Sequence, residues 1–193
     1  MTVIGVTGSS GAGKSTLTEV FSRHGALILD ADAIYHRLLS ESAELRDALT
    51  AEYGSEILTN GRVDRKKLRI IVFSDPEKLL TLNSLSHPFV IAEIVRSLET
   101  SRALTAVVDA PLLFESGLNG LCDVTVGVLA PREVRLGRIM ARDGITRETA
   151  EARLDAQKPD SYYMERCDLI LQNDRTARDF AEQVEKLWQA IGK

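Results

Sequence analysis

A glycine-rich stretch near the start of the chain constrains its fold more strongly than any other feature. The stretch reads Gly8-Ser9-Ser10-Gly11-Ala12-Gly13-Lys14-Ser15. It follows the apolar run 3–6 and precedes apolar residues at helical spacing, so it joins a predicted strand to a predicted helix. This is the GxxxxGK[ST] pattern of a phosphate-binding loop in its expected context. A glycine-rich βα turn without a ligand is the alternative, which the coincidence of strand, spacing and GKS ending disfavours.

The residue types of this loop match the chemistry of phosphate binding. Glycines let the backbone approach a phosphate closely, and consecutive N–H groups at a helix N-terminus attract the anion. Lys14 is expected to reach the β and γ phosphates, and Ser15 to offer its hydroxyl to Mg²⁺. The predicted phosphate-binding residues are Gly8, Ser9, Ser10, Gly11, Ala12, Gly13, Lys14, Ser15 and Thr16.

Composition excludes several classes of protein. The 193 residues are 44% hydrophobic and 27% charged, which predicts one globular domain with room for an inserted subdomain. The net charge of -4 argues against a general binder of nucleic acid or membrane surfaces. No stretch approaches the roughly 20 apolar residues of a membrane span, and the first residues do not resemble a signal peptide. Cys122 and Cys167 are expected to be buried thiols in a reducing compartment, so the sequence predicts a cytoplasmic protein. The sequence does not indicate an oligomeric state.

Apolar runs alternate with amphipathic helical patterns along the chain. Besides the first run, four short runs rich in Val, Ile or Leu are predicted strands, at 26–29, 105–108, 124–129 and 169–171. Runs without strict alternation are typical of strands that are covered on both faces by helices. A last helix is predicted over about 176–191, and the pattern as a whole favours an α/β fold with a parallel five-stranded sheet flanked by helices.

Two long intervals interrupt this alternation. The first is predicted to be a helical subdomain that holds the substrate, with a turn at Asn60-Gly61. The second is dense in arginine and lacks strand signals, which predicts a mobile lid. The predicted division is a core of 1–31, 104–131 and 167–193, a helical substrate subdomain of about 32–103, and a lid of about 132–166.

Carboxylates follow two of the predicted strands. In Asp30-Ala31-Asp32, we expect Asp32 to position a hydroxyl nucleophile or accept its proton, and Asp30 to cap the next helix; the reverse assignment is the alternative. Asp109 ends the third strand and is expected to hold Mg²⁺ or its waters. A role as a strand-end cap or salt-bridge partner is the alternative for Asp109.

Arginines crowd the predicted lid. Arg135, Arg138 and Arg142 would share one face of a helix, where their guanidinium groups would neutralise charge on a transferring phosphoryl group. The alternative is a solvated helix face on which the arginines pair with nearby acids. Those acids are Glu133, Asp143 and Glu148.

The predicted insertion contains further candidates for substrate contact. His36 follows the aspartate pair, and His87 precedes Pro88 between two predicted helices. Each histidine either contacts the substrate or serves as a structural hydrogen-bonding residue. The basic run 65–67 either meets an anionic substrate or forms an exposed face.

Together these motifs resemble those of the dephospho-coenzyme A kinase family. The matching segments cover nearly the whole chain and lie at 4–15, 29–32, 64–73, 82–88, 111–115, 135–144, 152–157 and 167–173. Many kinases share the phosphate-binding loop. The Asp-Ala-Asp, His-Pro and Pro-Leu-Leu-Phe-Glu blocks are the specific part of the resemblance.

The resemblance implies a P-loop kinase fold and an ATP-dependent enzyme with Mg²⁺. The enzyme would transfer the γ-phosphoryl group of ATP to the ribose 3′-hydroxyl of dephospho-coenzyme A, the final step of coenzyme A synthesis. The implied catalytic residues are Asp32, Lys14, Arg138 and Arg142, with Asn173 near the adenine and with Ser15 and Asp109 toward the metal. The implied acceptor-binding residues are Asp32, His36, His87, Leu113 and Glu115.

Some positions depart from the family pattern. Ser9 stands where the loop usually has a second glycine, and a positive φ at this position would cost about 1 kcal/mol. Tyr163 stands where a lysine is frequent, which puts a phosphate contact from that part of the lid in doubt, and Cys167 replaces an alanine. Another P-loop kinase of small molecules or nucleosides is the first alternative function. A nucleotide-dependent switch is the second, although the guanine-reading NKxD motif is absent from the sequence.

Overall fold

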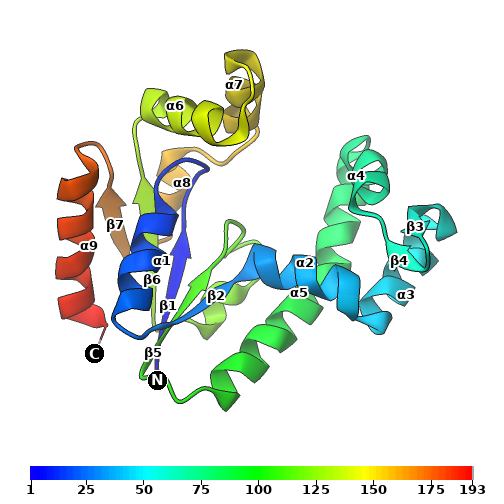
Figure 1. Ribbon diagram of the computed structural model, residues 1–193, viewed down its shortest axis with the longest axis horizontal. Coiled ribbons are helices and arrows are strands. Elements are labelled where there is room, and N and C mark those ends of the chain that lie inside the picture. Colours follow the sequence, from blue (N-terminus) through cyan, green and yellow to red (C-terminus); the bar gives the residue numbers. More distant parts are fainter. Residues whose placement is uncertain (193) are drawn as a thin grey trace. The chain divides into compact units, whose positions relative to one another are not determined.

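The five apolar runs form one parallel sheet in the computed structural model, which describes residues 1–192 (Figure 1). The strand order is β2-β5-β1-β6-β7, so the first strand lies in the middle of the sheet. The strands are β1 (Thr2–Thr7), β2 (Leu27–Asp30), β5 (Thr105–Asp109), β6 (Val124–Leu129) and β7 (Leu169–Gln172). The predicted strands and the α/β fold class are therefore confirmed.

The register of the sheet brings the ends of its central strands together. Val6 on β1 pairs with Asp109 on β5, and Thr7 pairs with Gly127 on β6. The strands run in the same direction, so their carboxyl ends share one edge of the sheet, where α/β folds bind ligands. The loop that leaves β1 and the carboxylate that ends β5 therefore lie at the same edge.

The chain divides into two compact units, Met1–Leu29 with Ser101–Lys193 and Asp30–Thr100. Lys193, the last residue of the predicted core, lies outside the described residues. The first unit contains the sheet and its flanking helices. These helices are α1 (Lys14–Arg23), the 3₁₀ turn η2 (Leu118–Leu121), α6 (Arg132–Asp143), α7 (Arg147–Asp155), α8 (Asp160–Met164) and α9 (Ala177–Ile191).

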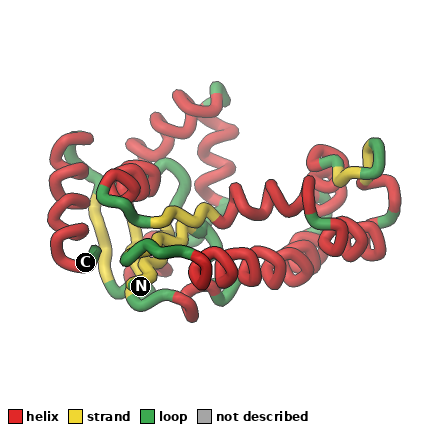
Figure 2. The backbone as a smooth tube through the Cα atoms, turned by 60° about the horizontal axis from the view of Figure 1, so that its bottom comes forward, coloured by secondary structure: helices red, strands yellow, loops and turns green. Residues whose placement is uncertain are grey.

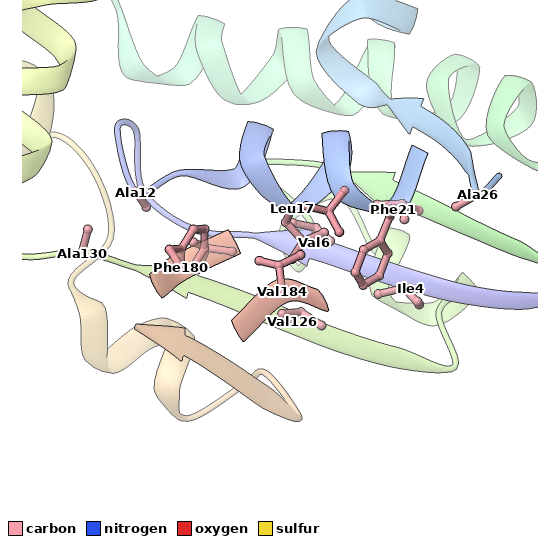
Figure 3. Close-up of a cluster of buried hydrophobic side chains, with 13 residues drawn as sticks. Ile4, Val6, Ala12, Leu17, Phe21, Ala26, Val126, Ala130, Phe180 and Val184 are labelled. Atoms are coloured by element: carbon pink, nitrogen blue, oxygen red, sulfur yellow. The ribbon is translucent and has the colours of Figure 1, made fainter. Parts of the chain in front are cut away.

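Helices α1 and α9 cover one face of this sheet. Their apolar side chains point toward those of β1 and β6 and form the main core of the first unit (Figure 3). Leu17 and Phe21 of α1 and Val184 of α9 are almost fully buried there. Each of these side chains is worth about 1.5–3 kcal/mol when fully buried, so this core holds β1 and α1, and hence the loop between them, in place.

The opposite face of the sheet packs tightly around two strand glycines. Gly5 on β1 faces Leu113 and the thiol of Cys122, and a Cβ atom at Gly5 would lie only 2.8 Å from that sulfur. Gly127 on β6 faces the thiol of Cys167 in the same way. Both thiols are free and half-buried, so the prediction of buried thiols holds only in part.

The arginine-rich segment folds as three helices with a small apolar core of its own. Leu136 and Ile139 of α6 pack against Ala150 and Leu154 of α7. The hydroxyl of Thr146 caps α7 by accepting the N–H of Thr149. The segment therefore has regular secondary structure and a core of its own, and it is not an irregular loop.

The second unit consists of helices and one short hairpin (Figure 2). Its elements are α2 (Ala31–Glu41), α3 (Ala43–Tyr53), the 3₁₀ turn η1 (Ser55–Ile57), β3 (Leu58–Thr59), β4 (Arg62–Val63), α4 (Arg65–Phe73) and α5 (Pro76–Thr100). Its core includes Leu39, Leu45, Leu49, Tyr53, Ile57, Leu68, Val72 and Leu82. No helix in the described part of the chain is long and apolar enough to span a membrane.

The hairpin is built on the predicted turn at Asn60-Gly61. Asn60 has φ 51° and Gly61 has φ 75°, and the strands pair antiparallel on either side. Two consecutive positive φ values are the signature of a two-residue type I′ turn, for which Asn-Gly is the favoured sequence. The turn is confirmed, whereas the two short strands around it were not predicted.

The prediction that His87 and Pro88 separate two helices is wrong. Helix α5 continues through this point, with Pro88 in its interior. A proline removes one helical N–H and therefore favours a break. Leu82 before the proline and Val90 after it are both buried, so packing of α5 on both sides of Pro88 outweighs the lost hydrogen bond.

Candidate active site

The loop between β1 and α1 adopts a conformation that requires its glycines. Gly8 has φ 136° and Gly13 has φ 111°, values that other residues rarely adopt. A side chain at Gly8 would also collide with the carbonyl group of Val128, and one at Gly13 with the amide of Asn173. The glycines therefore permit both the backbone angles and the close packing of the loop.

Ser9 does not strain the loop. Asn60 is the only non-glycine residue with a positive φ in residues 1–192, so the strain considered for Ser9 is not present. Its side chain is buried, with the residue only 2% exposed. Ser9 therefore keeps its backbone N–H as a donor at no cost in backbone geometry.

The first turn of α1 has the properties of an anion site. Gly13 is the N-cap residue and provides no side chain to accept the N–H groups of this turn, which also contains no acidic residue. Such N–H groups carry partial positive charge. Lys14 Nζ donates to the carbonyl oxygen of Gly8 at 2.7 Å, which holds the ammonium group at the loop. Backbone donors and a cation thus converge as a nucleotide phosphate requires.

Two side chains from later in the sequence hold the loop by its carbonyl groups. Arg138 Nη1 donates to the carbonyl oxygens of Gly11 and Ala12 at 3.0 and 3.2 Å. Asn173 Nδ2 donates to the same Ala12 oxygen at 2.8 Å, and its Oδ1 accepts from Arg138 Nη2 at 3.2 Å. Asn173 is only 3% exposed. Both predicted site residues thus contact the loop backbone in this structure.

Two further residues that contact the loop were not among the predicted site residues. Gln157 Oε1 accepts a hydrogen bond from the Ser10 N–H at 2.9 Å. Tyr163 is buried, and burial raises the pKa of its phenol, although a polar contact with the Ser9 hydroxyl acts in the opposite direction. A lone glutamine or tyrosine forms no charge or metal-ligand pattern, so the sequence contains no signal for these contacts beyond the resemblance around Gln157.

Arg142 is bound to an acid and also reaches the loop. Its Nε and Nη2 donate to the two carboxylate oxygens of Asp143 at 2.7 and 3.0 Å, and Nη2 lies 3.4 Å from the hydroxyl oxygen of Ser10. Arg153 contacts the same carboxylate. Hydrogen bonds from Arg142, and then from Arg153, lower the pKa of Asp143 to about 2. Asp143 therefore stays charged and orients two guanidinium groups.

Most other arginines of the predicted lid form ion pairs, as the alternative interpretation of this segment predicted. The pairs are Arg132 with Asp155, Arg135 with Asp160, and Arg147 with Glu133 and Glu151. Glu133 and Asp143 are thus confirmed as partners. Glu148 interacts mainly with its own backbone N–H and the Thr146 hydroxyl, which lower its pKa.

Two oxygen ligands are available for a magnesium ion. Ser15 is exposed in the first turn of α1, and Asp109 ends β5 beside Val6 of β1. The described residues contain no cluster of three or more His, Cys, Asp or Glu side chains that could hold a metal. Mg²⁺ commonly takes one or two protein oxygens and completes its coordination with waters and substrate phosphates, so these two residues fit it.

The two aspartates after β2 have different surroundings. Asp30 Oδ1 accepts the N–H of Ala33 at 2.9 Å, which confirms that Asp30 caps α2. Asp32 lies in the first turn of the same helix and is exposed. Of the pair, Asp32 is therefore the carboxylate that the helix cap does not occupy.

The second unit contains a cavity of about 510 Å³ with cationic and apolar walls. Its lining residues are Tyr35, His36, Leu39, Arg65, Lys66, Leu68, Arg69, Val72, Phe73 and Leu82. Arg65 Nη2 donates to Nε2 of His36 at 2.7 Å, and the Arg69 guanidinium lies over the ring of Phe73. Burial raises the pKa of Tyr35 to about 12, so its phenol is neutral. The cavity suits a ligand with anionic and apolar parts.

The remaining predicted acceptor-binding residues differ in exposure. His87 is half-buried on α5 in the second unit. In the first unit, Leu113 is fully buried against Gly5 and offers no surface to a ligand. Glu115 is exposed beside Tyr162, whose pKa is raised by burial and by this contact.

The chain is similar to known proteins over its whole length. A family model described as dephospho-CoA kinase matches residues 2–179. A dephospho-CoA kinase from Fusobacterium nucleatum is 36% identical over 190 residues, which cover 98% of each protein. The structure of TT1252 from Thermus thermophilus has a TM-score of 0.82 at 34% identity and covers 98% of this chain and 96% of that one. A dephospho-CoA kinase structure from Campylobacter jejuni has a TM-score of 0.71 at 32% identity, with the same two coverages.

Proposed function

The chain belongs to the dephospho-coenzyme A kinase family, and from this premise we propose which residues carry each part of the reaction. Members of the family are ATP-dependent kinases, and this chain catalyses the final step of coenzyme A synthesis. In that step the γ-phosphoryl group of ATP passes to the ribose 3′-hydroxyl of dephospho-coenzyme A. The products are coenzyme A and ADP.

The donor phosphates bind at the loop of residues 8–16. The observation that supports this proposal best is the convergence of Lys14 with the uncapped N–H groups at the start of α1. Lys14 neutralises the β and γ phosphates, and the loop N–H groups hold their oxygens. Asn173 fixes the loop from the side of β7. We assign this residue, at the end of that strand, to the surroundings of the adenine.

A magnesium ion bound with ATP would be held by the hydroxyl of Ser15 and, directly or through water, by the carboxylate of Asp109. The ion would supply neutralisation of the phosphate charge. The exposed position of Ser15 and the placement of Asp109 at the end of β5 support this assignment.

Asp32 orients the acceptor 3′-hydroxyl and takes up its proton as the phosphoryl group is transferred. Its exposure in the first turn of α2 supports this role, together with the commitment of Asp30 to the helix cap. Phosphoryl transfer has a loose transition state, so positioning of the nucleophile is the larger part of this contribution.

Arg138 and Arg142 stabilise the charge on the transferring phosphoryl group. Arg142 is held beside Ser10 by Asp143, and Arg138 is held on the loop carbonyl groups. A guanidinium that is already oriented by a neighbouring group loses less freedom when phosphate binds. The ion pair of Arg142 with Asp143 and the hydrogen bonds of Arg138 to the loop thus support a catalytic role for these two arginines.

The body of dephospho-coenzyme A binds in the second unit. The cationic side chains of Arg65, Lys66 and Arg69 match its diphosphate, and the apolar wall matches its pantetheine arm. His36 contributes through its hydrogen bond with Arg65, and His87 adds a polar group on α5. In the first unit, Glu115 is the exposed candidate for an acceptor contact, whereas Leu113 is too deeply buried to contribute.

We also place the enzyme in the cytoplasm. The free thiols of Cys122 and Cys167 support this location, because thiols persist in reducing compartments. Fractionation of cells that express the tagged chain checks the assignment.

A coupled assay of ADP release tests the acceptor. Purified protein with Mg-ATP is expected to turn over dephospho-coenzyme A and to leave adenosine and common nucleosides almost unused. Turnover of another alcohol, with no turnover of dephospho-coenzyme A, would favour the alternative of a different P-loop small-molecule kinase.

A further inference from the structure

Gln157 makes a contact with the phosphate-binding loop that the roles above do not include. Its Oε1 accepts the Ser10 N–H at 2.9 Å across 147 positions of sequence. Arg138 and Asn173 hold the loop by carbonyl groups, whereas Gln157 holds it by an N–H group. Loop N–H groups bind phosphate oxygens, so an acceptor fixed on one of them determines which N–H groups remain directed at the nucleotide.

Ser10 lies between two glycines of the loop. Gly8 and Gly11 flank it with φ values of 136° and 77°. Glycine loses more conformational freedom on ordering than any other residue, so a loop of this composition needs outside contacts to keep one conformation. The hydrogen bond that Gln157 accepts from the Ser10 N–H supplies such a contact between the two glycines.

Gln157 is itself well anchored. Its N–H donates to the carbonyl oxygen of Leu154 at 3.1 Å, which ties it to the end of α7. Leu154 belongs to the small core of α6 and α7, and Tyr163 on the following helix is 4% exposed. The acceptor on Ser10 is thus attached to the packed part of the lid.

We infer that Gln157 is a positioning residue for the donor nucleotide. Its side chain holds the Ser10 N–H toward the lid and keeps the other loop N–H groups arranged for the ATP phosphates. It acts through the loop backbone and keeps its hydrogen bond when nucleotide binds. The inference rests on the proposed function for the identity of the ligand. Because the effect is on preorganisation of the free enzyme, it changes the affinity for ATP more than the rate of transfer.

Kinetics of Q157M provide the first test. Methionine keeps a similar length and removes the strong acceptor. The KM for ATP is expected to rise about fivefold, the size of one lost hydrogen bond, with kcat within about twofold and the KM for dephospho-coenzyme A unchanged. Q189M makes the same exchange at an exposed position of α9 and is expected to keep all three values. An unchanged KM for ATP in Q157M would overturn the inference.

Amide hydrogen exchange at Ser10 provides a test that needs no turnover. Protection is expected in the wild type and in Q189M, with or without a non-hydrolysable ATP analogue, and in Q157E, whose carboxylate also accepts the N–H. Protection is expected to be lost in Q157M. Persistence of protection in Q157M would contradict the inference, as would its loss when the analogue binds to the wild type.

Two controls keep the outcome interpretable. If Q157M does not fold, Q157A gives the same two readouts. A wild-type protein that fails to phosphorylate dephospho-coenzyme A would overturn the proposed function alone, because Ser10 exchange and binding of the ATP analogue would still decide the role of Gln157.

Discussion

The two units of the chain present different chemical groups at their proposed binding surfaces, backbone N–H groups in one and side chains in the other. In the first unit, the loop after β1 presents backbone N–H groups, and glycines together with Arg138 and Asn173 set its shape. In the second unit, the cavity presents side chains such as Arg65 and Arg69. A backbone surface depends on geometry and tolerates few substitutions. A side-chain surface changes its chemistry one residue at a time, so donor and acceptor recognition are expected to respond separately to mutation.

The largest effect on catalysis is expected at Asp32, which follows closely after the boundary of the two units in the sequence. Asp32→Asn should lower kcat about a thousandfold, because an amide orients the acceptor hydroxyl less strongly than a carboxylate and cannot take up its proton. Binding of a non-hydrolysable ATP analogue, measured by calorimetry, should stay unchanged. Asp30→Asn is the matched control, since asparagine also caps helices well and should preserve activity. Full activity of Asp32→Asn would remove the role assigned to this carboxylate.

Loss of Lys14 from the phosphate-binding loop should reduce catalysis nearly as much. Lys14→Ala is expected to reduce kcat/KM for ATP by roughly two orders of magnitude, since a preorganised charge on the phosphates is lost. Lys186→Ala on the exposed side of α9 serves as the control. Steady-state kinetics at saturating acceptor measure both variants, and a rate equal to that of the wild type would take the loop out of the mechanism.

A moderate and selective effect should appear at the cavity. Arg65→Ala is expected to raise the KM for dephospho-coenzyme A about tenfold, because a charge-assisted contact with its diphosphate is lost. The KM for ATP should stay constant, which sharpens the separation between the units. Arg62→Ala, an exposed arginine outside the cavity lining, provides the comparison. Equal changes in the KM values for ATP and dephospho-coenzyme A would contradict the separate recognition of donor and acceptor.

The smallest effect concerns the stability of the second unit. Hydrogen bonds from Arg96, and then from Arg37, lower the pKa of Glu93 to about 2 from its ordinary value of 4.5. A lowered pKa means that this carboxylate stabilises the fold above pH 4.5 and loses that contribution as the pH falls toward 2. Glu93→Gln should lower the melting temperature by a few degrees at pH 7.

Melting curves of wild type and Glu93→Gln between pH 7 and pH 2 check this prediction. The difference between the two proteins should shrink as the pH falls. A constant difference over that range would show that the charge of Glu93 does not contribute through its arginine partners.

The first unit could be predicted from sequence because its signals are local. Each strand is a short run of Val, Ile or Leu, and the loop is marked by glycines at fixed spacing before Lys14. Asp30 was predicted as a cap from its place before an apolar pattern, and its bond to Ala33 confirms that role.

Contacts that depend on packing could not be predicted in this way. Pro88 indicates a helix end by its own chemistry, and only the burial of α5 on both sides explains why the helix continues. The bond between Gln157 and Ser10 joins two uncharged groups that are far apart in sequence. Neither partner has a spacing or composition that distinguishes it, so the contact becomes visible only in three dimensions.

The close packing of Cys122 and Cys167 against the strand glycines has a consequence for redox chemistry. The acceptor of this family carries a thiol, and its oxidised forms exchange with protein thiolates to give mixed disulfides. Burial raises the pKa of Cys122 to about 12 and that of Cys167 to about 11, so both remain protonated at neutral pH. Only the thiolate is the nucleophile in such exchange. The two thiols are therefore poor nucleophiles toward a disulfide of the acceptor.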